Sequence, residues 1–328
     1  MTKMILGKTD HEGEPGIEEV GFEGFELYVK LDDDLGIPPK TKNIFVIHQP
    51  KLVKAKGFYL PFDLADNSIE GHFSEKALER TVQYALRVGA SRVVSHGGFV
   101  DRTVSDLEQG QEIVARRINR IHHPEVLILL ENNPLWSTQM WINEPVLIDV
   151  KDFKNTLRQI EVPIGVCVDI EHLYRAAIFT SFYHKFDSEF RDLQDEEDYD
   201  ELVSLIDGQF SDFVSHPPNR IDSIIKKFVD DFFRELKPFI RQIHVCGFDY
   251  LTDRTHVRGQ VLPGAHLPLN YSGLSGGVEV CDRIDHKHYL RHLKGIDADV
   301  VVEVNNRPDY DYLKELKKSL EYLKGVLE

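Results

Sequence analysis

The chain has 328 residues, 41% of them hydrophobic, which is enough for one large core and is a common length for an α/β barrel. Its formal net charge of −16 disfavours broad binding to nucleic acid or to anionic membranes, because phosphate contacts need clustered Lys and Arg. No apolar stretch is long enough to cross a bilayer, the first residues lack a signal-peptide pattern, and the three cysteines have no CxxC spacing, so we expect a cytoplasmic protein without a membrane partner.

Strand and helix signals alternate along the chain, which is the pattern of βα units. Buried strands are expected at 24–30, 44–48, 92–96, 126–131, 163–169, 240–245 and 299–304, and 276–281 is placed as the strand before the last one. Helices are expected at 74–90, where Ser74 would be the N-cap, and at 104–121, 148–160, 228–239, 284–294 and 309–328. The link 49–73 is predicted to be a loop that lies over one end of the set of strands.

Polar residues able to bind a metal ion follow the apolar strands. The strand-end residues are His48, His96, Glu131, Asp169, His244 and Glu303, and His172 and His266 lie in the segments that follow strands. A residue just past the apolar part of a buried parallel strand lies at its carboxyl end, and only a closed barrel brings all these ends to one point. The sequence therefore predicts an α/β fold, a (β/α)8 TIM barrel, as a single domain over 1–328.

The segment 174–220 is longer than a minimal barrel needs. It is rich in Asp and Glu, interleaved with Phe, Leu, Tyr and Ile. We interpret it as an acidic helical insertion after the fifth expected strand, solvated on one face. A lid or a subunit contact is the alternative, since insertions at this end of a barrel lie on the active-site face, and a homo-oligomer is compatible with that.

Glu131 and Glu303 end runs that are too apolar for an unpaired charge, because a lone buried carboxylate costs several kcal/mol. A cation or a buried Arg must neutralise them. Two such carboxylates around a cation suit proton transfer next to a carbonyl group. Asp169 and His172 can present oxygen and nitrogen to the same ion or to adjacent ions. The other histidines, His122, His123, His286, His288 and His292, are interpreted as surface or structural residues.

The motifs HQP, FDLADNS, GASRVVSHGG, LLENNP, CVDIEH, QIHVCGFD, GAHLP and VVVEVNN extend over about residues 43–306. Their order resembles the xylose isomerase-like barrel superfamily, which holds sugar isomerases and epimerases together with endonuclease IV. The resemblance implies a divalent metal at the carboxyl-terminal mouth of the barrel. In the epimerase branch the ligands would be Glu131, Asp169, His244 and Glu303, counted as residues of strands four, five, six and eight, with His172 beside the substrate.

The endonuclease IV branch implies a three-metal cluster. His48, His96 and His172 would be additional ligands, and Asp253 with His256 or His266 would complete the set. Two departures affect the third metal position. The chain has Asp253-Arg254-Thr255-His256 in place of a tight Asp-Arg-His, and no Gly-Glu-Gly follows His266.

These observations leave three hypotheses. The preferred one is a divalent-metal isomerase or epimerase of a small sugar or polyol, with Glu131 and Glu303 as the acid/base pair, His172 at the substrate and one ion of Zn, Mn, Mg or Fe. The alternative is an endonuclease IV-like phosphodiesterase with up to three ions, and only this one implies a nucleic-acid partner. The third is a barrel that binds a ligand without turnover.

Overall fold

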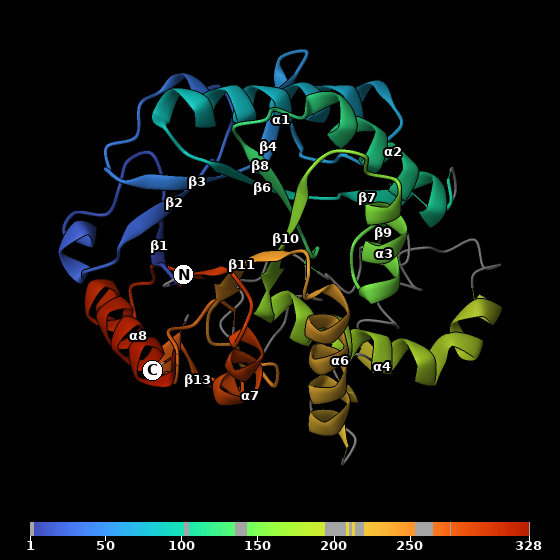
Figure 1. Ribbon diagram of the computed structural model, residues 1–328. Helices are drawn as coiled ribbons and strands as arrows, with labels where there is room; N and C mark the ends of the chain where they lie inside the picture. Colours follow the sequence, from blue (N-terminus) through green and yellow to red (C-terminus); the bar gives the residue numbers. More distant parts are fainter. Residues whose placement is uncertain are drawn as a thin grey trace.

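Eight parallel strands close into a barrel, which confirms the predicted fold class (Figure 1). The structure, a computed structural model, describes residues 3–101, 105–134, 143–193, 208–209, 212–213, 220–252, 265–275 and 277–327. Around the barrel the strands follow the order β1, β14, β11, β10, β8, β6, β3 and β2. Their bounds are β1 Ile5–Thr9, β2 Gly24–Tyr28, β3 Ile44–His48, β6 Arg92–His96, β8 Leu127–Glu131, β10 Ile164–Asp169, β11 Ile240–Val245 and β14 Asp299–Val302.

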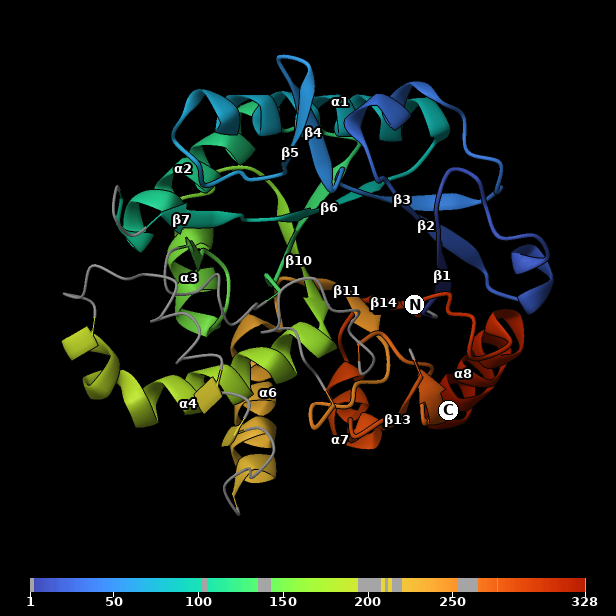
Figure 2. The same cartoon turned by 180° about the vertical axis from the view of Figure 1, so that it is seen from behind.

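Helices surround the barrel in both views (Figures 1 and 2). They are α1 Ile69–Val88, α2 Leu107–Ile121, α3 Val150–Arg158, α4 Ile170–Leu193, α6 Ile221–Leu236, α7 His286–Leu290 and α8 Tyr312–Leu327, with short 3-10 turns η1 Ile17–Val20, η2 Asp32–Gly36 and η3 Arg291–Leu293. No described helix is long and apolar enough to cross a membrane.

The first barrel strand, β1, was not predicted. Its sequence ILGKT has Gly7 and Lys8 where an apolar run would continue. A Cβ at Gly7 would lie 2.7 Å from Cδ2 of Phe22, so any larger residue would have to displace that ring. With β1 included, Glu131, Asp169 and His244 belong to the fifth, sixth and seventh barrel strands, one later than the sequence count.

The prediction that 276–281 is a barrel strand was wrong. In the described part of this segment, β13 Val278–Cys281 pairs antiparallel with β12 Ser272–Ser275 in a separate hairpin. Val278 and Glu279 are exposed and Val280 is buried, as expected for a surface strand. The predicted start of the first long helix was also wrong, because Ser68 and not Ser74 is the N-cap of α1.

Two further small sheets follow carboxyl ends of barrel strands. The link after β3 contains the hairpin of β4 Leu52–Ala55 and β5 Phe58–Pro61, and β7 Phe99–Asp101 pairs with β9 Asn143–Pro145. Figure 2 shows the β4–β5 hairpin projecting beyond α1. Leu52 and Pro61 line the cavity at the mouth, so this link lies where the sequence predicted it.

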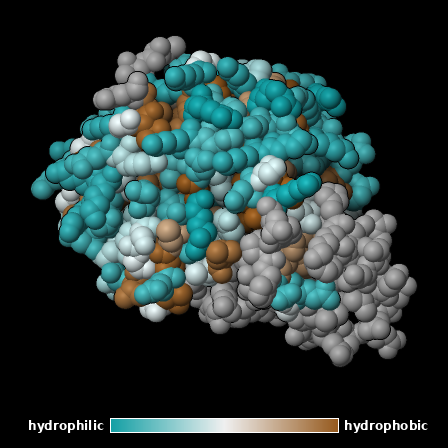
Figure 3. All heavy atoms as spheres, turned by 90° about the horizontal axis from the view of Figure 1, so that it is seen from below, coloured by the Kyte–Doolittle hydropathy of each residue, from teal (hydrophilic) through white to brown (hydrophobic). Residues whose placement is uncertain are grey.

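Residues 173–182 of α4 include buried core side chains, among them Leu173 and Phe182. Much of the remaining acidic segment, including 194–207 and 214–219, lies outside the described residues. The helical insertion expected at 174–220 therefore stays a prediction. On the face drawn in Figure 3, the coloured hydrophobic residues form small groups between hydrophilic ones.

The barrel interior holds a layer of apolar side chains below the mouth. Six of them are fully buried: Leu6, Val46, Val94, Leu129, Cys167 and Val301. Successive side chains of a strand alternate between its two faces, so the residue two positions later points into the same interior, one layer nearer the carboxyl end. Those residues are Lys8, His48, His96, Glu131, Asp169 and Glu303. The β alternation thus places the polar cluster directly above the apolar layer.

Candidate metal centre

Three carboxylate oxygens converge on Nδ1 of His244, which makes a set of four donor atoms. This nitrogen lies 3.0 Å from Oε1 of Glu131, 3.2 Å from Oε2 of Glu303 and 3.8 Å from Oδ2 of Asp169. Nδ1 of His244, Oδ2 of Asp169 and Oε2 of Glu303 are buried and have no hydrogen-bond partner within the described chain. Buried polar atoms are rarely left unsatisfied, and a cation among these four atoms would satisfy all of them. We call these residues the carboxylate-rich group.

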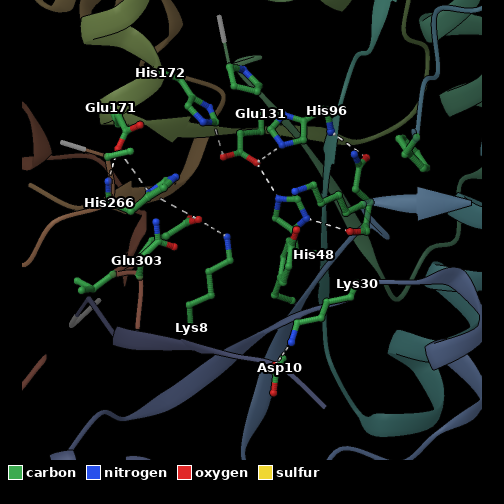
Figure 4. A pocket seen from close by; sticks show the side chains of 18 of the residues that line it. Lys8, Asp10, Lys30, His48, His96, Glu131, Glu171, His172, His266 and Glu303 are labelled. Carbon is green, nitrogen blue, oxygen red and sulfur yellow. Dashed lines mark hydrogen bonds and ion pairs between the residues drawn. The ribbon is translucent and has the colours of Figure 1, made fainter. Parts of the chain in front are cut away.

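A second donor set faces the other oxygen of Glu131. Nε2 of His48 lies 3.1 Å from Oε2 of Glu131, and Nε2 of His96 lies 3.4 Å from the same oxygen. We call His48 and His96 the histidine pair. Figure 4 shows them beside Glu131, with Glu303, Lys8 and His266 on another side. Glu131 therefore lies between two donor sets and presents one oxygen to each.

Hydrogen bonds outside the cluster orient the rings. Nε2 of His244 lies 2.9 Å from Oε2 of Glu26, and Nδ1 of His48 lies 3.0 Å from the carbonyl oxygen of Gln49. Each of these nitrogens is placed to donate its hydrogen, so the opposite nitrogen, which faces Glu131, would bind an ion once it carries no hydrogen. Such partners fix the tautomer of a metal-binding histidine.

His172 is oriented differently. Its Nδ1 lies 2.8 Å from the carbonyl oxygen of Asn132, and the same nitrogen is 4.0 Å from Oε1 of Glu131 and 3.9 Å from Oδ1 of Asp169. With Nδ1 donating to the backbone, Nε2 is the nitrogen that a ligand would meet. The structure thus brings His172 to the edge of the carboxylate-rich group, and its expected place beside a substrate stays a prediction.

The electrostatics favour a bound cation. Burial, together with the charges of Glu303 and Glu131, raises the pKa of Asp169 to about 7. Burial lowers the pKa of His96 to about 3, so this ring is neutral at physiological pH, as a metal ligand must be. Burial disfavours the charge of His244, but Cys167, Glu26 and Glu131 raise its pKa well above the ordinary value. The negative charges of Glu131, Asp169 and Glu303 are therefore only partly neutralised by the side chains around them, and a bound cation would complete the neutralisation.

Two residues that contact the carboxylate-rich group, Lys8 and Glu26, were not predicted from the sequence as site residues. Nζ of Lys8 lies 2.6 Å from Oε1 of Glu303, 3.7 Å from Oε1 of Glu26 and 5.0 Å from the ring centre of Tyr28. Glu26 is fully buried on β2. Its signal in the sequence was a charge flanked by Phe25 and Leu27, a spacing that turns Glu26 away from both neighbours and into the barrel. Lys8 had no such signal, because its strand was not recognised.

Of the residues expected at the third metal position, only His266 is described. Its Nδ1 lies 3.6 Å from Oε2 of Glu171 and 3.8 Å from Oε1 of Glu303, which places it at the rim. Burial opposes the charge of Glu171, but His266 and Arg175 lower its pKa to about 2. Asp253 and His256 lie outside the described residues, so their expected role is not tested.

The cluster forms the floor of a cavity of about 970 Å³. Four cationic side chains line this cavity: Lys8, Lys30, Lys51 and Arg175. Asp10 pairs with Lys30 and Glu171 pairs with Arg175. Five carboxylates line it as well, those of Asp10, Glu14, Glu131, Glu171 and Glu303, so the described lining is close to balanced in charge. The volume has room for a substrate larger than one sugar ring.

A family model described as a xylose isomerase-like TIM barrel matches residues 17–326. Among solved structures, a D-tagatose 3-epimerase-like protein has a TM-score of 0.59 at 14% identity, covering 99% of this chain and 97% of that chain. Endonuclease IV from Thermus thermophilus has a TM-score of 0.53 at 15% identity, covering 99% of this chain and 98% of that chain. A D-psicose 3-epimerase has a TM-score of 0.53 at 10% identity, covering 99% of each chain. No curated protein matches the chain. At these identities the likeness concerns the fold alone.

Proposed function

Since the chain belongs to the xylose isomerase-like TIM barrel family, whose fold supports several reactions, we propose that it is a metal-dependent phosphoester hydrolase that would hold two divalent ions, with Glu131 as a ligand common to both. The observation that carries the proposal is the division of Glu131 between two donor sets. Oε1 faces His244 at 3.0 Å, and Oε2 faces His48 at 3.1 Å and His96 at 3.4 Å. A single-ion centre is complete with the carboxylate-rich group and has no need of the histidine pair.

The donor atoms fit two ions. The carboxylate-rich group offers three carboxylates and one imidazole, a set that suits Mn²⁺ or Zn²⁺. The histidine pair with Oε2 of Glu131 offers two imidazoles and one carboxylate oxygen, which suits Zn²⁺ or Fe²⁺. Two ions in one centre supply Lewis acidity toward both the attacking and the leaving oxygen of a phosphoester.

The remaining residues of the mouth have roles in binding and orientation. Lys51 lines the cavity and would offset part of the charge of a phosphate group, whereas Lys8 already pairs with Glu303. His172 presents Nε2 at the edge of the centre and can donate to or accept from a substrate oxygen. The size of the cavity is consistent with a nucleotide or a longer phosphodiester, so nucleic acid is the partner that we propose to test first.

The second candidate is the isomerase or epimerase that the sequence favoured. It draws support from Glu131 and Glu303, which both contact Nδ1 of His244, at 3.0 Å and 3.2 Å, and would therefore both reach one ion beside it. In that reaction they would move a proton between neighbouring carbon atoms of a sugar. We place it second, because it assigns no function to the histidine pair.

Side-by-side assays test the order of the two candidates. Metal-free protein is reloaded with Mn²⁺, Zn²⁺ or Co²⁺ and offered bis(p-nitrophenyl) phosphate, a duplex oligonucleotide with one abasic site, and a set of ketohexoses. We expect cleavage of a phosphoester and a loss of at least about 100-fold in His48→Ala and in His96→Ala. His72→Ala, on the exposed side of α1, is the control. Epimerisation of a sugar that survives both substitutions would instead favour the second candidate.

A further inference from the structure

A second group of metal-binding side chains lies on the outside of the barrel. Asp230 belongs to α6, His288 to α7 and His292 to η3, and α7 and η3 precede the last barrel strand, β14. Figure 1 shows α6 and α7 at the periphery of the molecule, outside the ring of strands. None of the three residues lines the cavity at the mouth. We call them the peripheral cluster.

Both histidines of the peripheral cluster point at one carboxylate oxygen. Nε2 of His288 lies 2.8 Å from Oδ1 of Asp230, and Nε2 of His292 lies 2.6 Å from the same atom. The two histidines are four residues apart, and the ring centres are 5.9 Å from each other. Histidines at this spacing on one helical turn recur in zinc sites, because both rings lie on the same face.

The surroundings hold the ligands in place. The ring of His292 stacks on Phe233, with ring centres 5.2 Å apart and planes 7° apart. Phe233 follows Asp230 by three residues on α6, so the carboxylate and the stacking partner share one helix face. The side chain of Asp230 is 34% exposed and that of His288 only 10%, which shelters the nitrogens and leaves access for water. Burial opposes the charge of Asp230, but His292 and His288 keep its pKa below the ordinary value.

We propose that the peripheral cluster is a separate zinc site, with Nε2 of His288, Nε2 of His292 and a carboxylate oxygen of Asp230 as ligands and water in the fourth position. Ligand atoms of tetrahedral zinc lie about 3.3 Å from each other when the bonds are about 2.0 Å long, so the two contacts need to open by about half an ångström. The exposed carboxylate can make this movement. Arg291, whose Nη2 lies 3.3 Å from Oδ1 of Asp230, would then leave that oxygen.

Zinc in this position would connect α6 to the segment that leads into β14. The described contacts between these elements are otherwise packing contacts and ion pairs, such as Lys226 with Asp285 at 2.9 Å. The role of the ion would be to fasten the outer helices. This inference does not depend on the reaction at the mouth, because it uses none of the same residues.

Zinc titration of the chelator-stripped full-length protein, in competition with a chromophoric chelator, tests the proposal. Asp230→Asn keeps the size of the side chain and one hydrogen-bond acceptor, and His288→Ala with His292→Ala removes both nitrogens. We expect each variant to bind one zinc ion fewer than the wild type. His72→Ala, which removes a histidine paired with a single carboxylate on α1, is expected to bind the full number.

A second readout separates binding from damage to the fold. Far-UV circular dichroism checks that Asp230→Asn is folded, and the thermal midpoint is measured with and without Zn²⁺. We expect zinc to raise the thermal midpoint of the wild type by more than it raises that of Asp230→Asn. An equal zinc count and an equal thermal shift in the wild type and in Asp230→Asn would overturn the proposal and leave the peripheral cluster as a hydrogen-bonded group.

Discussion

Glu26 and His244 are 218 residues apart in the chain and are both fully buried, and their Oε2 and Nε2 atoms lie 2.9 Å apart inside the barrel. Gln242 joins them, with its Nε2 at 2.6 Å from the same carboxylate oxygen. This contact turns Nδ1 of His244 toward Glu131, Asp169 and Glu303. A buried carboxylate that holds a histidine in this way also makes the other nitrogen a stronger electron-pair donor.

Glu26→Gln should therefore weaken metal binding without removing a ligand. The amide keeps the shape but no longer attracts the hydrogen of Nε2 as a charged group does, and partners of this kind change metal affinity by about 10–100-fold. Chelator competition measures the affinity, with the exposed Glu279→Gln as the control. An unchanged affinity in Glu26→Gln would mean that this contact does not tune the centre.

His48→Ala should lower the metal content by one ion per chain and leave the ion of the carboxylate-rich group in place. Toward the carboxylate-rich group, the described ion-pair contacts of the histidine pair are with Oε2 of Glu131, whereas the first ion keeps four donors that do not include His48. Glu131→Gln, in contrast, should affect both ions, because both sets share this residue. Elemental mass spectrometry of protein purified without a chelator or a histidine tag gives the counts. Equal metal content in the wild type and in His48→Ala would contradict the assignment.

Lys8→Met should destabilise the metal-free protein more than the metal-loaded protein. Lys8 neutralises Glu303 in a largely buried pair, and removing one partner of such a pair costs about 3–5 kcal/mol. Bound ions would replace that positive charge. Urea unfolding of the wild type and of Lys8→Met, each with and without metal, provides the four free energies of unfolding. The same loss in both forms would show that metal and Lys8 do not share Glu303.

Metal binding should release more protons at pH 6 than at pH 8. The pKa of Asp169 is raised to about 7 and that of His244 is raised well above its ordinary value, so both hold protons at pH 6 in the metal-free protein. His96, with a pKa of about 3, holds none. We expect more protons to be released at pH 6 than at pH 8, because ligands must lose their protons and Asp169 still holds its proton at pH 6 but has lost most of it by pH 8. Calorimetry in buffers of different ionisation enthalpy counts them, and an identical count at both values would refute this.

The same shift predicts a direction for stability. The folded-state pKa of Asp169 lies above the unfolded value of 3.8, so the stability that its proton contributes is fully present below that value and is lost as the pH rises through about 7. The metal-free protein should show this loss, and Asp169→Asn should remove this component. Free energies of unfolding in urea between pH 5 and pH 8 are the measurement. A loss of the same size in Asp169→Asn would assign it to other groups.

The positions of the strand-end candidate ligands could be predicted because they follow or end apolar runs such as LILLE and IGVCVD, which mark strands buried on both faces. Lys8 and Glu26 were missed for physical reasons. Gly7 and Lys8 break the apolar run of β1, and Glu26 lies in the middle of its strand, where a charge is tolerated only because Lys8, Gln242 and His244 surround it. Such a pairing across the barrel becomes visible only when the sheet is closed.

The segment 278–281 shows the opposite error. VEVC has the β-branched residues of a strand, but Val280 is its one buried residue and the other three are exposed, as in a hairpin on the surface. Composition alone does not distinguish the two. The contact of Glu131 with two donor sets could not be predicted from the sequence either, because it depends on which oxygen each histidine ring faces and not on the position of Glu131 in the chain.

Anomalous diffraction at the metal edge, from crystals of the metal-loaded protein, tests the central claim most directly. The proposal predicts two peaks about 3.5–4 Å apart with Glu131 between them, one within the carboxylate-rich group and one against His48 and His96. A single peak within the carboxylate-rich group, with the histidine pair still contacting Glu131 directly, would contradict the two-ion centre and would favour the isomerase.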